Sequence, residues 1–194
     1  MEFWLVLIVI TAFFIYLIKI YNEIVNLRNR VDNGWSQIDV QLQRRYDLIP
    51  NLVETAKGYM KHEKETLDLV IKARNAAYDT SREISVDPSD SEKIKKIRSE
   101  EKTLQSAMMN FQALAENYPD LKSNTNMLQL QEELATTENK VAFSRQGFND
   151  AVMQYNTGIE VFPNSLIAQT FKFKEASEWV LENEEAKQPV TVSF

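Results

Sequence analysis

The stretch NRVDNGWSQIDVQLQRRYDLIPNLV, from Asn29 to Val53, decides the fold of this chain. It is rich in amides, carboxylates and arginines, yet an apolar residue returns in it every three or four positions. Alternating steps of three and four place side chains on one helical face, as in a coiled-coil seam. The seam extends beyond the quoted stretch, and its positions are Leu17, Tyr21, Ile24, Arg28, Val31, Trp35, Ile38, Leu42, Arg45 and Ile49.

An apolar segment, FWLVLIVITAFFIYLIKIY at residues 3–21, overlaps the start of this seam. About 19 helical residues span roughly 28 Å, close to the ~30 Å hydrocarbon core of a bilayer, and Lys19 can snorkel to its edge. A cleaved signal peptide would begin with basic residues and end in small ones, whereas this segment begins Met1-Glu2. A buried helix of a soluble bundle is the other alternative, although it would not need apolar residues on nearly every face. We therefore expect a retained single-pass transmembrane helix.

Positive charges follow this segment rather than precede it. Lys19, Arg28 and Arg30 lie on its C-terminal side, and Glu2 lies on the other. The positive-inside rule predicts an outside N-terminus and a cytoplasmic body, with the opposite topology left open.

The rest of the chain also has helical periodicity. No proline occurs before Pro50, so the anchor and the first body helix are predicted to form one rod, with Asp47 as a cap and Pro50 in the first turn of a second helix. Further helices are predicted over residues 52–77, 94–117 and 127–162, with a long loop at 79–92.

The predicted fold class is therefore all-α: a single N-terminal transmembrane helix continuous with a long antiparallel up-down bundle of about four helices, plus a short C-terminal helical tail. Residues 1–2 form a short tail, 3–21 the membrane helix and 22–163 the bundle. Residues 164–194 form an amphipathic and acidic segment with an extended end.

The composition excludes several kinds of chemistry. There is no cysteine and a single histidine, His62, so the chain lacks the converging ligands of a typical structural or catalytic zinc site and the usual partners of a nucleophile. The four glycines lie singly, which excludes a glycine-rich phosphate loop, and the net charge of −6 does not favour nucleic acid. We expect no enzymatic activity, cofactor, metal, small-molecule substrate or nucleic-acid partner.

Two groups of polar residues on the first helix are candidate partner contacts. Arg45 stands at a seam position, where it must pair, snorkel or point outward, and Arg44 precedes it. These arginines form either a bundle-end cluster with Asp47 as counter-ion or a site for an acidic partner, such as the glutamate-rich C-terminal stretch. The other group is a ladder of amides at steps of four residues, which either binds another helix or is a solvated stripe: Asn29, Asn33, Gln37 and Gln41.

The C-terminal segment contains a third group of candidates. Apolar residues recur in NSLIAQTFKF, and the chain closes in PVTVSF, which is typical of an extended segment. These residues either cap the bundle or contact a partner, the tail by strand addition to a sheet edge. The candidates are Leu166, Ile167, Phe171, Phe173 and Phe194.

In its motifs the chain resembles the bacterial LemA family. The resemblance rests on LRNRVDNGWSQIDVQLQRRYDLIPNLVETAKGYMKHEKET with its preceding anchor, and on ENYPDLKSN, LQLQEELATTENKVAFSR, YNTGIEVFPNSLIA and the closing VSF. It implies one N-terminal membrane helix and a long helical bundle facing the cytoplasm, in a family that includes proteins of magnetosome membranes. Gly34 stands where the family usually has alanine. The resemblance implies no reaction and no catalytic residues.

The sequence thus predicts a non-enzymatic scaffold in the bacterial cell membrane that presents a coiled-coil-like bundle for self-association or for other membrane proteins. The alternative is an adaptor that recruits a partner enzyme or a membrane surface through its C-terminal segment.

Overall fold

The longest element of the computed structural model, which describes residues 2–85, 87–88 and 90–180, is helix α1 (Glu2–Lys57). Its first third carries apolar side chains that are exposed, and α1 is the one helix in the described part of the chain that is long and apolar enough to cross a membrane. Past Tyr21 the apolar residues of the predicted seam are buried from Ile24 to Ile49, whereas Arg28 is exposed and Arg45 is partly buried. The seam prediction is confirmed within the bundle.

The predicted helix boundary at Pro50 is wrong, because α1 continues through this proline to Lys57. Proline lacks the N–H that would bond to the carbonyl oxygen four residues earlier, here that of Tyr46. The Nε–H of Arg74, on the next helix, donates to this oxygen at 2.8 Å. A side chain distant in sequence therefore replaces the missing helical hydrogen bond, and the turn comes later, after Lys57.

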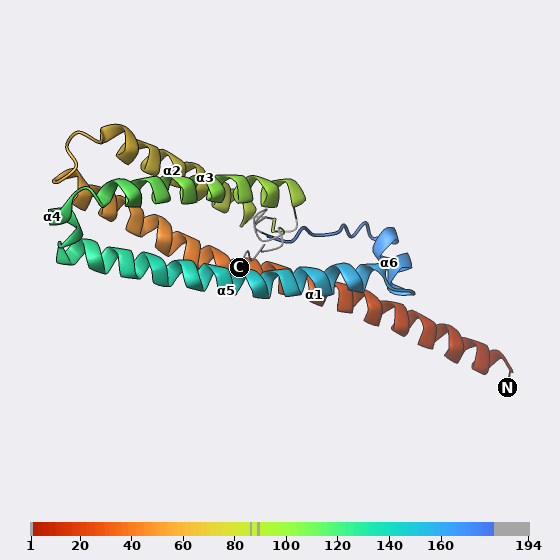
Figure 1. Ribbon diagram of the computed structural model, residues 1–194. Coiled ribbons are helices and arrows are strands. Elements are labelled where there is room, and N and C mark those ends of the chain that lie inside the picture. Colours follow the sequence, from red (N-terminus) through yellow and green to blue (C-terminus); the bar gives the residue numbers. More distant parts are fainter. Residues whose placement is uncertain (1, 86, 89, 181–194) are drawn as a thin grey trace, which may run out of the picture.

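Five further helices complete the described chain, which has no strand, so the all-α prediction is confirmed. Figure 1 shows α2 and α3 as an antiparallel hairpin over one half of α1, with α5 running beside α1 toward the membrane-type segment. The five helices are α2 (Lys64–Ile84), α3 (Ser91–Ala115), α4 (Pro119–Lys122), α5 (Thr125–Glu160) and α6 (Asn164–Thr170).

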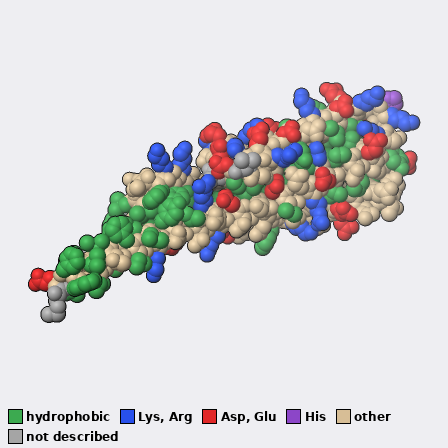
Figure 2. Space-filling view, turned by 180° about the vertical axis from the view of Figure 1, so that it is seen from behind, with side chains coloured by type: hydrophobic (Ala, Val, Ile, Leu, Met, Phe, Trp, Pro, Cys, Tyr) green, Lys and Arg blue, Asp and Glu red, His purple; other side chains and the backbone are tan. Residues whose placement is uncertain are grey.

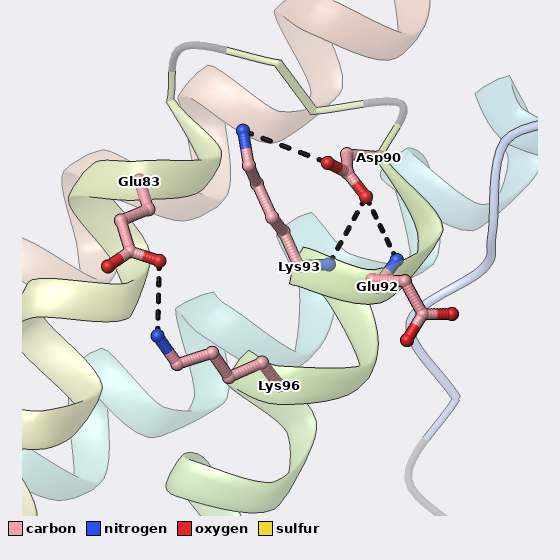
Figure 3. A network of polar contacts seen from close by, with 5 residues as sticks. All are labelled: Glu83, Asp90, Glu92, Lys93 and Lys96. Atoms are coloured by element: carbon pink, nitrogen blue, oxygen red, sulfur yellow. Dashed lines mark hydrogen bonds and ion pairs between the residues drawn. The ribbon is translucent and has the colours of Figure 1, made fainter.

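The loop between α2 and α3 is shorter than the predicted 79–92. Thr80, Ser81 and Ile84 are buried, and the Ser81 hydroxyl donates to the Asp39 carboxylate at 2.7 Å, so tertiary contacts extend α2 through polar residues that suggested a loop. Asp90 then caps α3 by accepting from the backbone N–H of Glu92 at 3.0 Å and of Lys93 at 3.4 Å (Figure 3).

Two of the glycines mark close approaches between α1 and α5. A Cβ added at Gly34 would lie 3.1 Å from the Cα of Phe148, and one added at Gly158 would collide with the Leu27 side chain. These two glycines therefore allow α1 and α5 to pack closely. At Gly34, the space for the family's usual alanine is tight.

Candidate functional site

A buried polar centre joins α1 to α3. Arg45 forms an ion pair with Glu101, and the Tyr46 hydroxyl donates to the other Glu101 oxygen at 2.5 Å. Arg45 and Glu101 are only 15% and 7% exposed, so the carboxylate depends on these two partners rather than on water. Arg45 therefore pairs within the bundle, whereas Asp47, its expected counter-ion, lies 3.7 Å from Arg74.

Burial governs the ionisation of this centre. It lowers the pKa of the Arg45 guanidinium and raises the pKa of the Tyr46 hydroxyl far above its usual range. The pKa of Arg145, on α5, is lowered by burial and then by the nearby charge of Arg45. Arg145 has no ion pair in the described residues, and its guanidinium lies 5.9 Å from the Trp179 ring centroid. Glu138 of α5 already acts on Arg45 by raising its pKa, so Arg145 is the cation of this region with which an additional acidic group could pair.

A groove of about 290 Å³ runs past this centre between α3 and α5, with α1 as its floor. It exists because α1 packs closely on α5 and on α2, and α2 on α3, whereas α3 and α5 do not approach each other closely. Met109 is 62% exposed on its rim. The apolar residues of the groove include Leu104, Met108, Met109, Leu134, Val141 and Ala142.

The predicted amide ladder does not stay on one face of α1. Each step of four residues turns about 40° around a helix with 3.6 residues per turn, so the side chains drift sideways along the ladder. Asn29, Asn33 and Gln37 are exposed, whereas Gln41 is half-buried and its Oε1 has no hydrogen-bond partner in the structure. Arg44 is exposed beside them. The first three amides and Arg44 thus remain available to a partner.

The C-terminal segment returns along the bundle as an extended strap, residues 174–180 (Figure 1). Asn149 and Asn156 of α5 hold it by binding the backbone N–H and C=O of Trp179 and Ala176, respectively, at 2.7–3.2 Å. The two asparagines are seven residues apart on α5, and their partners are three residues apart on the strap. Seven helical residues and three extended residues each span about 10 Å, so each asparagine lies opposite its partner. Trp179 is thereby buried against Trp35, with ring centroids 5.6 Å apart.

The C-terminal candidates occupy two environments around α6. Ile167 and Phe173 pack against the core, whereas Leu166 and Phe171 are each 57% exposed. Phe194 and the rest of PVTVSF lie outside the described residues, so strand addition by this tail stays a prediction.

The sequence analysis did not identify the polar residues that pair with Arg45 or hold the strap. In the apolar seam of α3, the position between Ile97 and Leu104 would normally be apolar, but it is Glu101. This acidic residue at a seam position was the feature of the sequence that could have indicated a buried polar site. An acid in one seam and Arg45 in another indicate that each needs a buried partner, although their spacing does not specify that the two meet. The asparagines that hold the strap give no comparable signal, because exposed asparagines are common on helices. Among the described residues, no group of three or more His, Asp and Glu side chains could hold a metal ion.

Comparisons with known proteins agree with the motifs. The sequence model of the LemA family matches residues 34–194. The chain is also similar to Protein LemA of Metamycoplasma hominis, with 25% identity over 169 residues that cover 86% of this chain and 73% of that protein. The residues matched by the family model include the groove, its polar centre and the strap.

Proposed function

Because this chain belongs to the LemA family, we propose that it is a membrane-anchored scaffold that binds a partner helix in the groove between α3 and α5. In this proposal residues 3–21 cross a bacterial cell membrane once, and the bundle lies in the cytoplasm. The protein is not an enzyme in this role; it positions other proteins, or further copies of itself, at the bilayer.

The unbroken course of α1 is the observation that carries the proposal. Side chains such as Trp4, Ile8 and Val9 are 62–67% exposed, and the same helix then supplies the bundle core from Ile24 onward. An exposed apolar surface of this extent is unfavourable in water and fits a hydrocarbon environment. Since no turn separates the two parts, a membrane-embedded first third would fix the bundle to the bilayer as a projecting rod.

The open groove supports a helix as the bound element. Its apolar walls lie between two long helices, as in grooves that receive the apolar face of an amphipathic helix. A docked helix would cover Met108 and Met109, and Arg145 could bind an acidic side chain at the polar end. The exposed Asn29, Asn33, Gln37 and Arg44 offer a second contact face on α1.

A charge placed in the groove tests this proposal. Ala142 is exposed and lines the groove, whereas Thr136, on the same helix, is exposed but does not line it. In membranes, crosslinking through a photoreactive residue at position 139, which is also exposed, should give adducts with the unaltered chain and with Thr136→Arg, but several-fold fewer with Ala142→Arg. Mass spectrometry of the adducts distinguishes a second copy from another membrane protein. Equal adduct yields in the two arginine variants would contradict groove binding.

A further inference from the structure

An exposed apolar surface at the membrane-facing end of the bundle is not explained by the anchor or by the groove. It is formed by the turn between α5 and α6, by α6 and by the residue that follows α6. Phe162 is 81% exposed, and Leu166 and Phe171 are each 57% exposed. We call this surface the collar and define it as Phe162, Leu166 and Phe171.

The collar lies at the level where the apolar part of α1 leaves the bundle. Tyr21 is the last residue of the apolar segment 3–21. The centroid of its ring lies 4.8 Å from that of the Phe171 ring and 5.8 Å from that of the Phe173 ring. Beyond α6, α1 continues alone toward the N-terminus (Figure 1). In the space-filling view the apolar surface of the free helix continues onto the body without a polar break (Figure 2).

Basic side chains border this apolar surface. Lys19, on α1, and Lys172 and Lys174, which follow α6, are exposed. Figure 2 shows Lys and Arg side chains grouped where the apolar helix meets the body, although the whole chain carries a net charge of −6. Glu23, Glu160 and Glu175 are also exposed at this end, so the basic side chains border the collar without a net positive charge there.

Together these features match an interfacial membrane contact. Aromatic and long basic side chains are enriched at the boundary between hydrocarbon and headgroups, where the ring or stem is apolar and the charged end meets phosphate. We propose that the collar inserts into the interfacial layer of an anionic phospholipid bilayer beside the point where α1 emerges. This inference rests on the proposed anchoring of residues 3–21.

The consequence is a second point of attachment. One helix through a bilayer leaves the tilt of the rod open, because tilt depends on interfacial anchors and on neighbouring helices. The collar lies to one side of α1, so its insertion would fix both the tilt and the rotation of the rod. The groove between α3 and α5 would then face a defined direction relative to the membrane.

The absence of cysteine makes this contact measurable in the full chain. Single cysteines at Leu166, Ile15 and Leu128 can each carry a spin label, because these side chains are 57%, 52% and 51% exposed. The protein is placed, one copy per nanodisc, in lipid that contains phosphatidylglycerol. Accessibility to oxygen, which concentrates in lipid, is compared with accessibility to a water-soluble nickel complex.

We expect labels at Ile15 and Leu166 to favour oxygen several-fold more than the label at Leu128, at the far end of α5. A Leu166 label that behaves like Leu128, with Ile15 in lipid, overturns the collar and leaves the anchor intact. An aqueous Ile15 label overturns the anchor itself. In a separate preparation with two copies per disc, a short spin–spin distance between their Leu166 labels would indicate that a second copy covers the collar, and would also overturn the proposal.

The charge requirement is tested separately. Replacing phosphatidylglycerol with phosphatidylcholine, or introducing Lys172→Gln with Lys174→Gln, should move the Leu166 label toward water. A matched double change at Lys95 and Lys102, which are exposed on α3, should leave its depth unchanged. A depth that responds to neither the lipid nor the Lys172 and Lys174 changes overturns the preference for anionic headgroups.

Discussion

At the residue scale, the centre formed by Arg45, Tyr46 and Glu101 is the most constrained part of the bundle. Each of these residues would be costly to bury alone, and each is stabilised by the other two. Arg45 belongs to α1 and Glu101 to α3. These two helices do not pack closely on each other; each packs on α2. The ion pair therefore fixes the position of α3 over α1, and with it one wall of the groove.

Breaking the pair on one side should be strongly destabilising. Arg45→Met leaves the Glu101 carboxylate buried without its counter-ion, and we expect a loss of about 3–5 kcal/mol in the free energy of unfolding. Combining it with Glu101→Leu and Tyr46→Phe should recover most of this loss. Urea unfolding in detergent, followed by circular dichroism, measures both. Lys96→Met, which removes the exposed contact with Glu83 (Figure 3), should change stability by less than about 1 kcal/mol.

Stability should also fall at high pH because of Tyr46. Burial raises its pKa in the folded protein, so above about pH 10 the unfolded chain loses this proton while the folded chain keeps it. The unfolded state then binds fewer protons, and the free energy of unfolding decreases by up to about 1.4 kcal/mol per pH unit. Tyr46→Phe should have a smaller slope between pH 10 and 11. Equal slopes for the two proteins would contradict this account.

At the element scale, the length of α1 depends on a residue of α2. Arg74 donates to the carbonyl oxygen that Pro50 leaves without its helical partner, and its guanidinium lies 4.7 Å from the Tyr78 ring centroid. The helix thus passes its proline because another helix supplies a donor. Without that donor, a buried carbonyl would lack a hydrogen bond at the centre of the bundle.

A double-mutant cycle tests this explanation. In the natural sequence Arg74→Met should lower the free energy of unfolding by about 1.5–3 kcal/mol. In a Pro50→Ala background the new N–H can bond to the Tyr46 oxygen, so the same change should cost about 1 kcal/mol less. Additive effects of the two substitutions would show that Arg74 does not replace the missing bond.

The position of the strap also depends on hydrogen bonds from another element, α5. Changing both Asn149 and Asn156 to Ala removes four hydrogen bonds, and we expect faster hydrogen exchange at the Ala176 and Trp179 amides and faster tryptic cleavage after Lys174. Asn139→Ala, at an exposed position on the same helix, is the matched control and should change neither. Unchanged exchange in the double variant would mean that Trp179 alone holds the strap.

At the scale of the whole molecule, the protein is a tapered rod. The hairpin of α2 and α3 widens the end far from the apolar segment, while α1, α5, α6 and the strap form the narrower end (Figure 1). From Tyr21 to Lys57, α1 extends roughly 54 Å at about 1.5 Å per residue. An anchored rod held upright would therefore place the turn after α1 far from the lipid.

This height is open to measurement. A donor dye on a single cysteine at position 62, in the exposed turn after α1, should transfer little energy to acceptor-labelled lipid, whereas a donor at position 29 should transfer much more. Comparable transfer from both positions would indicate that the rod lies along the membrane surface.

Sequence and tertiary structure decided different parts of this protein. The sequence alone determined the all-α fold, the seam from Ile24 to Ile49 and the candidate membrane helix, because helical periodicity and an apolar run are local properties of the chain. Only the tertiary structure decided that α1 passes Pro50, that Arg45 pairs with Glu101 and that asparagines of α5 bind the strap. Each of these depends on a polar group whose partner lies far away in the sequence. The energy of a buried hydrogen bond or ion pair depends on which groups meet, and chain spacing does not specify that meeting.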